Sequence, residues 1–310
     1  MPLLTIGMPT YDDFDGVYFT IQALRLYQNL NDANLLVVDN YGCATTQAFV
    51  EGVPGATYVQ SLSVSGTAAA KNDVFAHADG AFVLCLDSHI LLAPRAIERL
   101  ATWCRDHPDS LDLLQGPLWL DDLQPAGVAT HLSQTWSGGM LGQWETDDRG
   151  IDPDTEPFDI SNQGMGLFAC RRDVWPGFNS RFRGFGGEEG YLQAKVRRLG
   201  GRAICLPFLR WVHRFGRPRG TPYRVRDSDK FRNYLIGHLE VGMDLDSLFD
   251  HFATILPPEV LRTIVSREFE EGGWQFLGYE QSAVMALVED AVANGHSTIE
   301  SVDVDAAPRG

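Results

Sequence analysis

The first part of the chain alternates short apolar runs with longer segments whose apolar residues recur every three or four positions. Runs of aliphatic and β-branched residues, each followed by polar residues, lie at residues 3–9, 34–40, 56–60 and 81–87. Such runs are typical of buried strands. Between the first two, Val17, Ile21 and Leu24 recur at helical spacing. Strands separated by helices predict an α/β fold with a parallel sheet covered on both faces.

The same pattern continues with one long interruption. Residues 65–78 and 94–104 are expected to form helices, whereas residues 108–163 lose periodicity and are rich in Gly, Asp and Trp. A connection of that length is typical of a lid or substrate loop. The later segments are a strand at 166–175, a helix at 188–201, a strand at 202–216, and acidic helical segments followed by a polar tail. We therefore predict a domain at residues 1–235 and a helical extension at residues 236–310.

Composition indicates an ordinary soluble protein. Hydrophobic residues make up 44% and charged residues 21% of the 310 positions, and no apolar run approaches the ~20 residues that span a bilayer. The first residues resemble a strand and lack a basic segment with a cleavage site, so we expect a cytoplasmic protein without a membrane span. Its five cysteines form no CxxC pair, which favours buried free thiols.

Charge is distributed unevenly along the chain. The net charge is −16, yet residues 171–232 hold 16 Lys and Arg against five Asp and Glu, a local balance of +11. Such asymmetry suggests a face that meets an anion. The alternative is a set of surface arginines that merely share a stretch of sequence.

A candidate metal site follows the apolar run at residues 81–87. Asp87 and His89 are one residue apart, so their side chains can point the same way and converge on one ion. A carboxylate and an imidazole suit an ion such as Mn²⁺ better than Ca²⁺. His213, near the end of another predicted strand, is the best candidate for a third ligand. Alternatively, the strand ends at Leu86, and Asp87 simply opens a turn.

Two further clusters have candidate chemistry. Paired glycines precede Glu188 and Glu189, which permits close approach to a ligand and places two carboxylates at a helix start. An ordinary acidic helix N-terminus is the alternative. Near the first strands, Asp39 is a candidate acceptor for the imide N–H of a uracil, and Lys71 is a candidate phosphate contact. A solvated helix lysine is equally ordinary.

Taken in order, these motifs resemble the family 2-type glycosyltransferases with the GT-A fold. The matching positions are Pro9 to Asp12, Val37 to Asn40, the set Gly66, Ala70, Lys71 and Asn72, and Leu86 to His89. Histidine in place of a second aspartate is similar to the polypeptide N-acetylgalactosaminyltransferases, whose later motifs resemble residues 164–168, 185–189 and 212–215. The resemblance covers residues 3–216 and does not extend to that family's lectin domain.

The resemblance implies a GT-A fold, a Rossmann-like, mixed and mainly parallel sheet flanked by helices, here with a helical C-terminal extension. It also implies a UDP-sugar donor and an Mn²⁺ or Mg²⁺ ion held by Asp87, His89 and His213. Arg214 or Arg217 would assist the departing UDP. The donor-binding residues that we expect are Pro9, Thr10, Tyr11, Asp39, Gly66, Lys71, Asp87, Ser88, Gly164, Met165, Gly166, Gly187 and Arg214.

Mechanism and acceptor stay open at this point. Retaining members of the resembling family have Asn after the motif glutamate, whereas inverting galactosyltransferases of similar fold have a catalytic Asp there. Glu189 at this position favours an inverting enzyme with Glu189 as base and Glu188 as a donor or acceptor contact. A retaining enzyme and a non-catalytic nucleotide-sugar-binding module are the alternatives. A nucleotidyltransferase would have a glycine- and lysine-rich loop after the first strand.

The expected acceptor is a hydroxyl compound, and the basic stretch makes an anionic one a hypothesis. A surface polysaccharide precursor is the commoner type of acceptor. A hydroxymethylated base in DNA is the rarer one, and the local charge of +11 keeps it in consideration.

Overall fold

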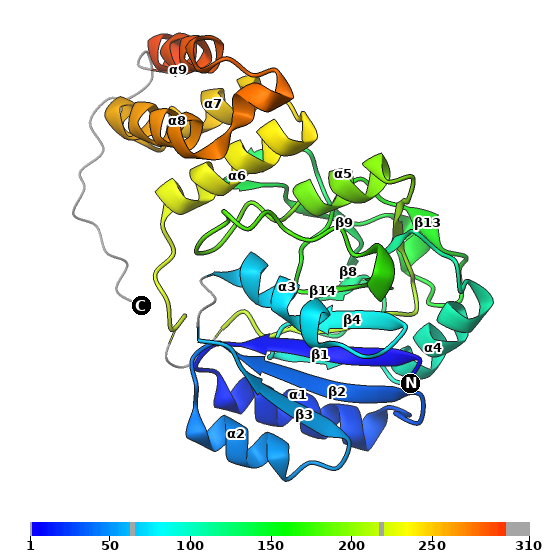
Figure 1. Ribbon diagram of the computed structural model, residues 1–310. Helices are drawn as coiled ribbons and strands as arrows, with labels where there is room; N and C mark the ends of the chain where they lie inside the picture. The colour runs from blue at the N-terminus through cyan, green and yellow to red at the C-terminus, as the bar shows by residue number, and fades with distance from the viewer. Residues whose placement is uncertain (1, 63–65, 217–219, 296–310) are drawn as a thin grey trace.

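The computed structural model describes residues 2–62, 66–216 and 220–295. An eight-stranded sheet forms its centre (Figure 1). In spatial order, its strands are β13 (Phe158–Asp159), β15 (Ala203–Cys205), β6 (Leu113–Gln115), β14 (Leu167–Arg171), β4 (Phe82–Leu86), β1 (Leu4–Thr10), β2 (Ala33–Asp39) and β3 (Ala56–Gln60). Strands β3, β2, β1 and β4 are parallel, and β14 runs antiparallel to β4. The mixed, mainly parallel sheet predicted from the sequence is therefore confirmed.

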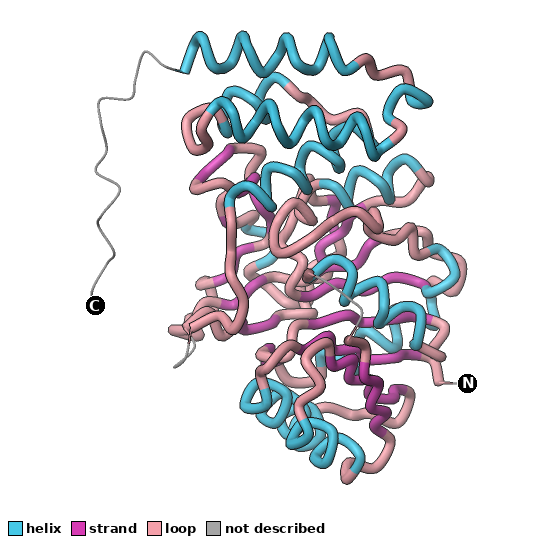
Figure 2. The backbone as a smooth tube through the Cα atoms, turned by 60° about the vertical axis from the view of Figure 1, so that its left-hand side comes forward, coloured by secondary structure: helices cyan, strands magenta, loops and turns pink. Residues whose placement is uncertain are grey.

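Helices cover both faces of this sheet and form a separate layer at one end. The helices are α1 (Phe14–Tyr27), α2 (Ala44–Glu51), α3 (Thr67–His77), α4 (Ala96–Asp106), α5 (Tyr191–Arg198), α6 (Asp227–Val241), α7 (Asp246–Phe252), α8 (Pro258–Gly272) and α9 (Gln281–Gly295). Figures 1 and 2 both place α6 to α9 together, on the side of the molecule opposite α1 and α2. In the part of the chain that the structure describes, no helix has the length and apolar character required to cross a membrane.

Alternation of side chains along the strands divides the core in two. In β2, Leu35 and Val37 join the cluster under α1, α2 and α4, whereas Leu36 and Val38 join the cluster that includes α3 and the C-terminal helices. Successive strand residues point to opposite faces, so an uninterrupted apolar run indicates burial on both sides. The continuous run in β4 divides in the same way.

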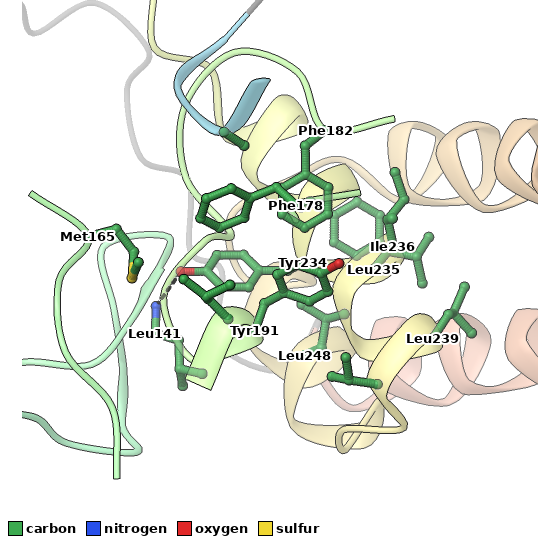
Figure 3. Packing of buried hydrophobic residues seen from close by; sticks show 14 of the residues in the cluster. Leu141, Met165, Phe178, Phe182, Tyr191, Tyr234, Leu235, Ile236, Leu239 and Leu248 are labelled. Atoms are coloured by element: carbon green, nitrogen blue, oxygen red, sulfur yellow. Dashed lines mark hydrogen bonds between the residues drawn. The ribbon is translucent and has the colours of Figure 1, made fainter. Parts of the chain in front are cut away.

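The second of these clusters extends into the C-terminal helices. Phe182 and Tyr191 precede α6, and they belong to one buried cluster with Tyr234 in α6 and Leu248 in α7 (Figure 3). The predicted domain boundary after residue 235 falls inside α6. The division of the chain into two domains stays a prediction, and the polar tail at 296–310 lies outside the described residues.

Three smaller sheets take most of their strands from the segment that lost its periodicity, residues 108–163. Strand β5 (Ile90–Leu92) belongs to a sheet with β16 (Trp211–His213), β7 (Leu118–Trp119) and β8 (Val128–Ala129). Strand β9 (His131–Leu132) pairs with β12 (Trp144–Glu145), and β10 (Trp136–Ser137) pairs with β11 (Met140–Leu141). Short 3₁₀ segments lie at Asp148–Gly150, Arg172–Val174 and Trp274–Leu277. We call residues 131–145 the nested hairpin.

Two predicted boundaries are wrong. The run at 202–216 is not one strand, because it turns at Pro207 and contributes β15 to the large sheet and β16 to a small one. Proline has no amide hydrogen to continue a ladder, which explains the break. The predicted helix at 188–201 begins only at Tyr191, because Gly190 has a φ of +78°.

Candidate functional site

A cavity of about 740 Å³ opens along one edge of the large sheet. The carboxyl ends of β2, β1 and β4 lie at this edge, followed by the start of the antiparallel β14. In that order they contribute Asn40, Thr10, Asp87 and Gly166 to the wall. Ligands in open α/β sheets bind beyond the carboxyl ends of the strands. The volume is also in the ordinary range for a small-molecule site.

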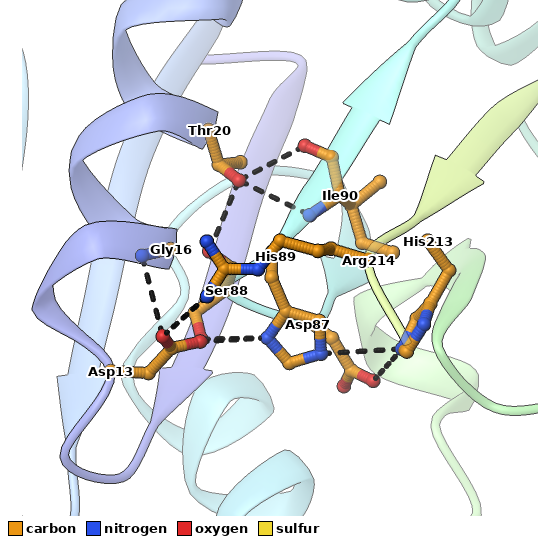
Figure 4. Close-up of polar contacts among 9 residues, drawn as sticks. All are labelled: Asp13, Gly16, Thr20, Asp87, Ser88, His89, Ile90, His213 and Arg214. Atoms are coloured by element: carbon orange, nitrogen blue, oxygen red, sulfur yellow. Dashed lines mark hydrogen bonds and ion pairs between the residues drawn. The ribbon is translucent and has the colours of Figure 1, made fainter. Parts of the chain in front are cut away.

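Three predicted metal ligands meet near the middle of this edge. Asp87 follows β4, His89 lies in the turn before β5, and His213 ends β16. One ligand atom from each lies within 4.8 Å of the other two. Figure 4 shows the three side chains next to one another. His89 Nε2 is 3.2 Å from His213 Nε2, which in turn is 3.6 Å from Asp87 Oδ2. Two imidazoles and one carboxylate fit a divalent ion of the Mn²⁺ type.

The turn that bears Asp87 and His89 is fixed on both sides. Asp87 N donates to Gly166 O at 2.9 Å, which ties the turn to the start of β14. From α1, Thr20 Oγ1 accepts a hydrogen bond from Ile90 N at 3.1 Å and lies 3.0 Å from Ser88 O (Figure 4). The ligand side chains therefore project from a rigid support.

Opposing charges keep Asp87 ionised. Burial alone would raise the pKa of Asp87, but the hydrogen bond from His213 and the charges of Lys71 and His89 lower it to about 2. Burial would likewise lower the pKa of Lys71, but the carboxylates of Glu188 and Asp87 raise it above its ordinary value. Lys71 lines the cavity and is therefore a cation within a group of carboxylates.

Glu188 and Glu189 form a buried pair on the same cavity. Thr67 Oγ1 donates a hydrogen bond to Glu188 Oε1, whereas Glu189 Oε2 is buried with no hydrogen-bond partner among the described residues. Burial first, and the neighbouring charge of Glu188 second, raise the pKa of Glu189 to about 7. A carboxyl group with that pKa, facing a cavity, suits proton transfer near neutral pH.

The loop before this pair is held from α6. Asn233 Nδ2 donates to the carbonyl oxygens of Arg183 at 2.7 Å and Gly186 at 2.8 Å, and its Oδ1 accepts from Arg183 N at 3.0 Å. Gly187 has a φ of +89°, and a Cβ there would lie 2.6 Å from Asn233 Cβ. Only glycine fits both the conformation and the space. Gly187 thus places the glutamates and does not line the cavity.

The predicted nucleoside end differs from expectation at one residue. Pro9, Thr10 and Tyr11 line the cavity, but Asp39 is fully buried beneath it. Its carboxylate accepts hydrogen bonds at 2.8–2.9 Å, from the backbone N–H groups of residues 41–43 and from Tyr58 Oη. The next residue, Asn40, is the one that faces the cavity.

The other predicted donor contacts divide into two groups. Gly66, Ser88, Gly164, Met165 and Gly166 line the cavity, as Lys71 and Asp87 do. Arg214 is not part of the wall, and its Nη2 lies 3.6 Å from Asp13 Oδ1. Arg217 lies outside the described residues.

The sequence alone did not identify several residues of the wall. These are Asp13 at the start of α1, Tyr223 and Arg224 before α6, and Leu132, Met140 and Trp144 of the nested hairpin. Asp13 had a detectable signal, since it stands directly before a helix and next to a matched motif. The hairpin residues had none, because two-residue strands show no period.

Most of the described basic residues of the stretch at 171–232 bond to other groups of the protein. Arg181 and Arg232 pair with Glu268, and Lys195 pairs with Glu240. Other side chains bond to carboxylates or carbonyl oxygens, namely Arg171, Arg172, Arg197, Arg198, Arg202, Arg210 and Lys230. Among the described Lys and Arg residues of 171–232, Arg224 lines the cavity.

Comparison with known proteins gives one family and several structures. The model of the family described as Glycosyl transferase family 2 matches residues 5–174. No curated protein matches the chain. The crystal structure of GalNAc-T7 with UDP, GalNAc and Mn²⁺ is 15% identical with a TM-score of 0.65, covering 93% of this chain and 54% of that one. This chain therefore spans about half the length of that structure.

Two further structures are similar. The mannosyltransferase PcManGT from Pyrobaculum calidifontis, in complex with GDP-Man and Mn²⁺, is 15% identical with a TM-score of 0.52, covering 96% of this chain and 87% of that one. S. aureus TarS is 13% identical with a TM-score of 0.53, covering 96% and 55% respectively. At these identities the matches establish the fold, and with the family match they confirm the resemblance drawn from the motifs.

Proposed function

The chain belongs to glycosyl transferase family 2 and is a glycosyltransferase, and from that premise we propose that it transfers a sugar from a UDP-sugar to an acceptor hydroxyl. One observation carries this proposal. Asp87, His89 and His213 converge on the wall of one cavity, which Thr10, Tyr11 and the pair of glutamates also line. A metal-bound diphosphate there would place the nucleoside on one side and the sugar on the other.

The proposed ion is Mn²⁺, or Mg²⁺, held by these three side chains. Its chemical role would be that of a Lewis acid that neutralises the negative charge of the departing diphosphate. Lys71 would add a second positive charge to the same region, since it is buried and lines the cavity. Two of the similar structures contain Mn²⁺ with a nucleotide or nucleotide sugar, which supports this choice.

For the donor, we propose that the nucleoside lies at the ends of β1 and β2. Pro9 and Tyr11 offer apolar and aromatic surface there, and Tyr11 contacts the rings of Tyr41 and Tyr223. Asn40 replaces Asp39 as the polar group available to the base, because the Asp39 carboxylate is already occupied. Thr10, Gly66, Ser88 and the loop at 164–166 complete the proposed donor contacts.

For the chemistry, we propose inversion with Glu189 as the general base. The acceptor hydroxyl would give its proton to Glu189 while its oxygen attacks C1 of the sugar, and the bond from C1 to the diphosphate oxygen breaks. Glu189 suits this role because it lines the cavity, its Oε2 has no hydrogen-bond partner among the described residues, and its pKa is raised to about 7. Glu188 is bonded to Thr67 and is better placed to hold a sugar hydroxyl.

For the acceptor, we propose a carbohydrate such as a polysaccharide precursor. Beyond Gly166, the wall is formed by Trp144, Leu132 and Met140 of the nested hairpin, an apolar and aromatic surface that suits the C–H face of a sugar ring. A hydroxymethylated DNA base is less favoured, because most of the described basic residues already pair with groups of the protein itself.

The test is a screen of UDP-sugars and GDP-mannose for Mn²⁺-dependent release of nucleotide. We expect turnover with one UDP-sugar, its loss in Asp87→Ala, and no loss in Asp109→Ala, whose side chain is fully exposed. Turnover with GDP-mannose alone would refute the nucleotide assignment, and turnover that survives metal removal would refute the metal role. The anomeric configuration of the product, measured by NMR, then decides between inversion and retention.

The acceptor class has its own test. Binding to duplex DNA that weakens steeply with salt would favour the modified-DNA acceptor. Absence of such binding, together with transfer to a neutral sugar, would support the carbohydrate.

A further inference from the structure

We propose that Asp13 is a positioning residue of the metal site, which holds the Nδ1–H of His89 and so directs His89 Nε2 toward His213 and Asp87. This inference rests on the proposed function, because it assigns a purpose to that orientation. It concerns a residue outside the three ligands.

The contact itself is short and buried. Asp13 Oδ2 lies 2.8 Å from His89 Nδ1, and the two side chains are 9% and 6% exposed. Ser88 Oγ donates to the same carboxylate oxygen at 3.0 Å. On the opposite side of the ring, His89 Nε2 is 3.2 Å from His213 Nε2, so the imidazole stands between the carboxylate and the candidate ligands (Figure 4).

The donor and acceptor chemistry selects one tautomer. An ionised carboxylate can only accept, so the ring nitrogen that faces it must be the one that bears hydrogen. A neutral His89 then has its lone pair on Nε2, which is the form that binds a metal. Carboxylate groups behind ligating histidines have this role in many metal sites. The second histidine has no such support, because His213 Nδ1 is buried without a partner among the described residues.

Asp13 is itself held in place by α1. It is the N-cap of that helix, where its Oδ1 accepts from Gly16 N at 3.3 Å, and Arg214 Nη2 lies 3.6 Å from the same oxygen. Because Thr20 of α1 also supports the turn at Ser88 to Ile90, one helix fixes both the backbone and the ring of His89. Arg214 therefore acts on Asp13 and not on the cavity.

Three variants separate the positioning role from the capping role. Asp13→Ser keeps an N-cap oxygen but is too short to reach His89, and Asp13→Asn keeps both the cap and an acceptor oxygen. The matched control is Asp12→Asn, which removes an exposed carboxylate from the adjacent residue. Asp12 has a φ of 47°, a conformation that asparagine tolerates well.

The first measurement titrates Mn²⁺ alone into the purified full chain and follows the free ion by electron paramagnetic resonance. We expect Asp13→Ser to weaken Mn²⁺ binding by about 10- to 100-fold. The loss should be smaller in Asp13→Asn and absent in Asp12→Asn. Unchanged Mn²⁺ affinity in a folded Asp13→Ser protein would overturn the proposal.

The second measurement needs no metal and no Asp13 variant. Long-range ¹⁵N–¹H NMR of the wild-type histidine rings, assigned to His89 with a His89→Gln sample, reports which nitrogen bears hydrogen. Hydrogen on Nδ1 supports the proposal, and hydrogen on Nε2 overturns it. If the wild type shows this tautomer yet binds no Mn²⁺, the metal assignment fails while the positioning of His89 stands.

Discussion

At the scale of single residues, Glu189 carries the largest consequence for chemistry. Its burial beside Glu188 raises its pKa to about 7, and no other described residue satisfies its Oε2. Three further ionisable side chains act electrostatically with it, namely Lys71, Asp87 and Tyr234. An ion bound at Asp87 would add positive charge and lower the pKa of Glu189 from that value.

We predict that Glu189→Gln lowers the rate of sugar transfer by about 10²- to 10⁴-fold, the usual contribution of a general base. Binding of UDP and Mn²⁺ should persist, because neither involves this carboxylate. Steady-state kinetics and calorimetry measure the two effects. Glu270→Gln, on the exposed face of α8, is the control and should leave both unchanged. Transfer that survives in Glu189→Gln would favour a retaining enzyme.

The same carboxyl group predicts a pH dependence of stability in the metal-free protein. Its pKa is about 7 in the folded state against 4.5 as the ordinary value, so the folded state binds more protons in this interval. The free energy of unfolding therefore falls as pH rises from 4.5 to 7, by an amount on the order of 3 kcal/mol. Urea titrations at pH 4.5 and 7.5 should show that the stability of Glu189→Gln, measured relative to wild type, is greater at pH 7.5 than at pH 4.5. An equal difference at both pH values would contradict the shift.

At this scale the sequence predicted which residues lie near the cavity better than it predicted what each of them contacts. Asp87, His89 and His213 are brought together as predicted, because the turn between β4 and β5 bears Asp87 and His89, and β16, which ends at His213, pairs with β5. Asn40 lines the cavity where Asp39 was expected to, because successive residues at the end of β2 point in opposite directions and Asp39 is buried. Asp13 escaped notice because its partner is 76 positions away.

At the scale of elements, α6 acts as a clamp on the loop of the two glutamates. Asn233 makes three hydrogen bonds to that loop, and Gly187 of the loop packs directly against Asn233. The loop is also held by Thr67 N, which donates to Gly184 O at 2.9 Å. The position of Glu189 thus depends on α3 and α6, two helices far apart in sequence.

We predict that Asn233→Ala removes the hydrogen bonds that hold the loop of the two glutamates to α6. Three backbone groups lose their partners, which should cost about 1–3 kcal/mol of stability. The transfer rate should fall more than Mn²⁺ affinity does, because the metal ligands lie on other elements. Denaturant titration measures the stability, and steady-state kinetics and Mn²⁺ titration measure the transfer rate and the Mn²⁺ affinity. Asn31→Ala, on the exposed turn before β2, is the control. Equal loss of transfer and Mn²⁺ affinity would argue against a local clamp.

Helical elements of the first half could be predicted because their apolar residues share one face. Val17, Ile21 and Leu24 are all buried in α1. The nested hairpin could not, because its pairing depends on contacts such as Leu132 N to Asn162 O at 2.9 Å. Such contacts join segments that have no periodicity of their own. The site is therefore predictable where strands supply it and unpredictable where loops do.

At the scale of the whole molecule, α8 is tied to the loop of the two glutamates through a network of ion pairs around the buried Glu268. Glu268 has no exposed surface and lies 2.7 Å from Arg181 Nη2 and 2.6 Å from Arg232 Nε. Arg181 stands just before the clamped loop, and Arg232 is the neighbour of Asn233. The C-terminal helix α8 thus helps to hold the loop of the two glutamates in position.

We predict that Glu268→Ala destabilises the protein by about 3–5 kcal/mol, because it removes the counter-charge of the buried Arg232 and the nearer of the two carboxylates that pair with Arg181. Glu271→Ala removes a half-exposed partner of Arg181 and should cost no more than about 1 kcal/mol. Thermal or urea unfolding measures both. A small effect of Glu268→Ala would mean that α8 is dispensable for the rest of the fold.

The nested hairpin has a consequence for the way such an enzyme acquires new acceptors. Trp136 stacks on His251 of α7 at 5.0 Å between ring centroids, and Leu141 N donates to Tyr234 Oη of α6 at 2.9 Å. Leu132, Met140 and Trp144 of the same hairpin line the cavity. The hairpin and the C-terminal helices therefore form one packed unit. A chimera that receives only a relative's hairpin would gain the residues proposed to contact the acceptor but not the helices that support them, whereas exchanging the hairpin, α6 and α7 together would transfer both.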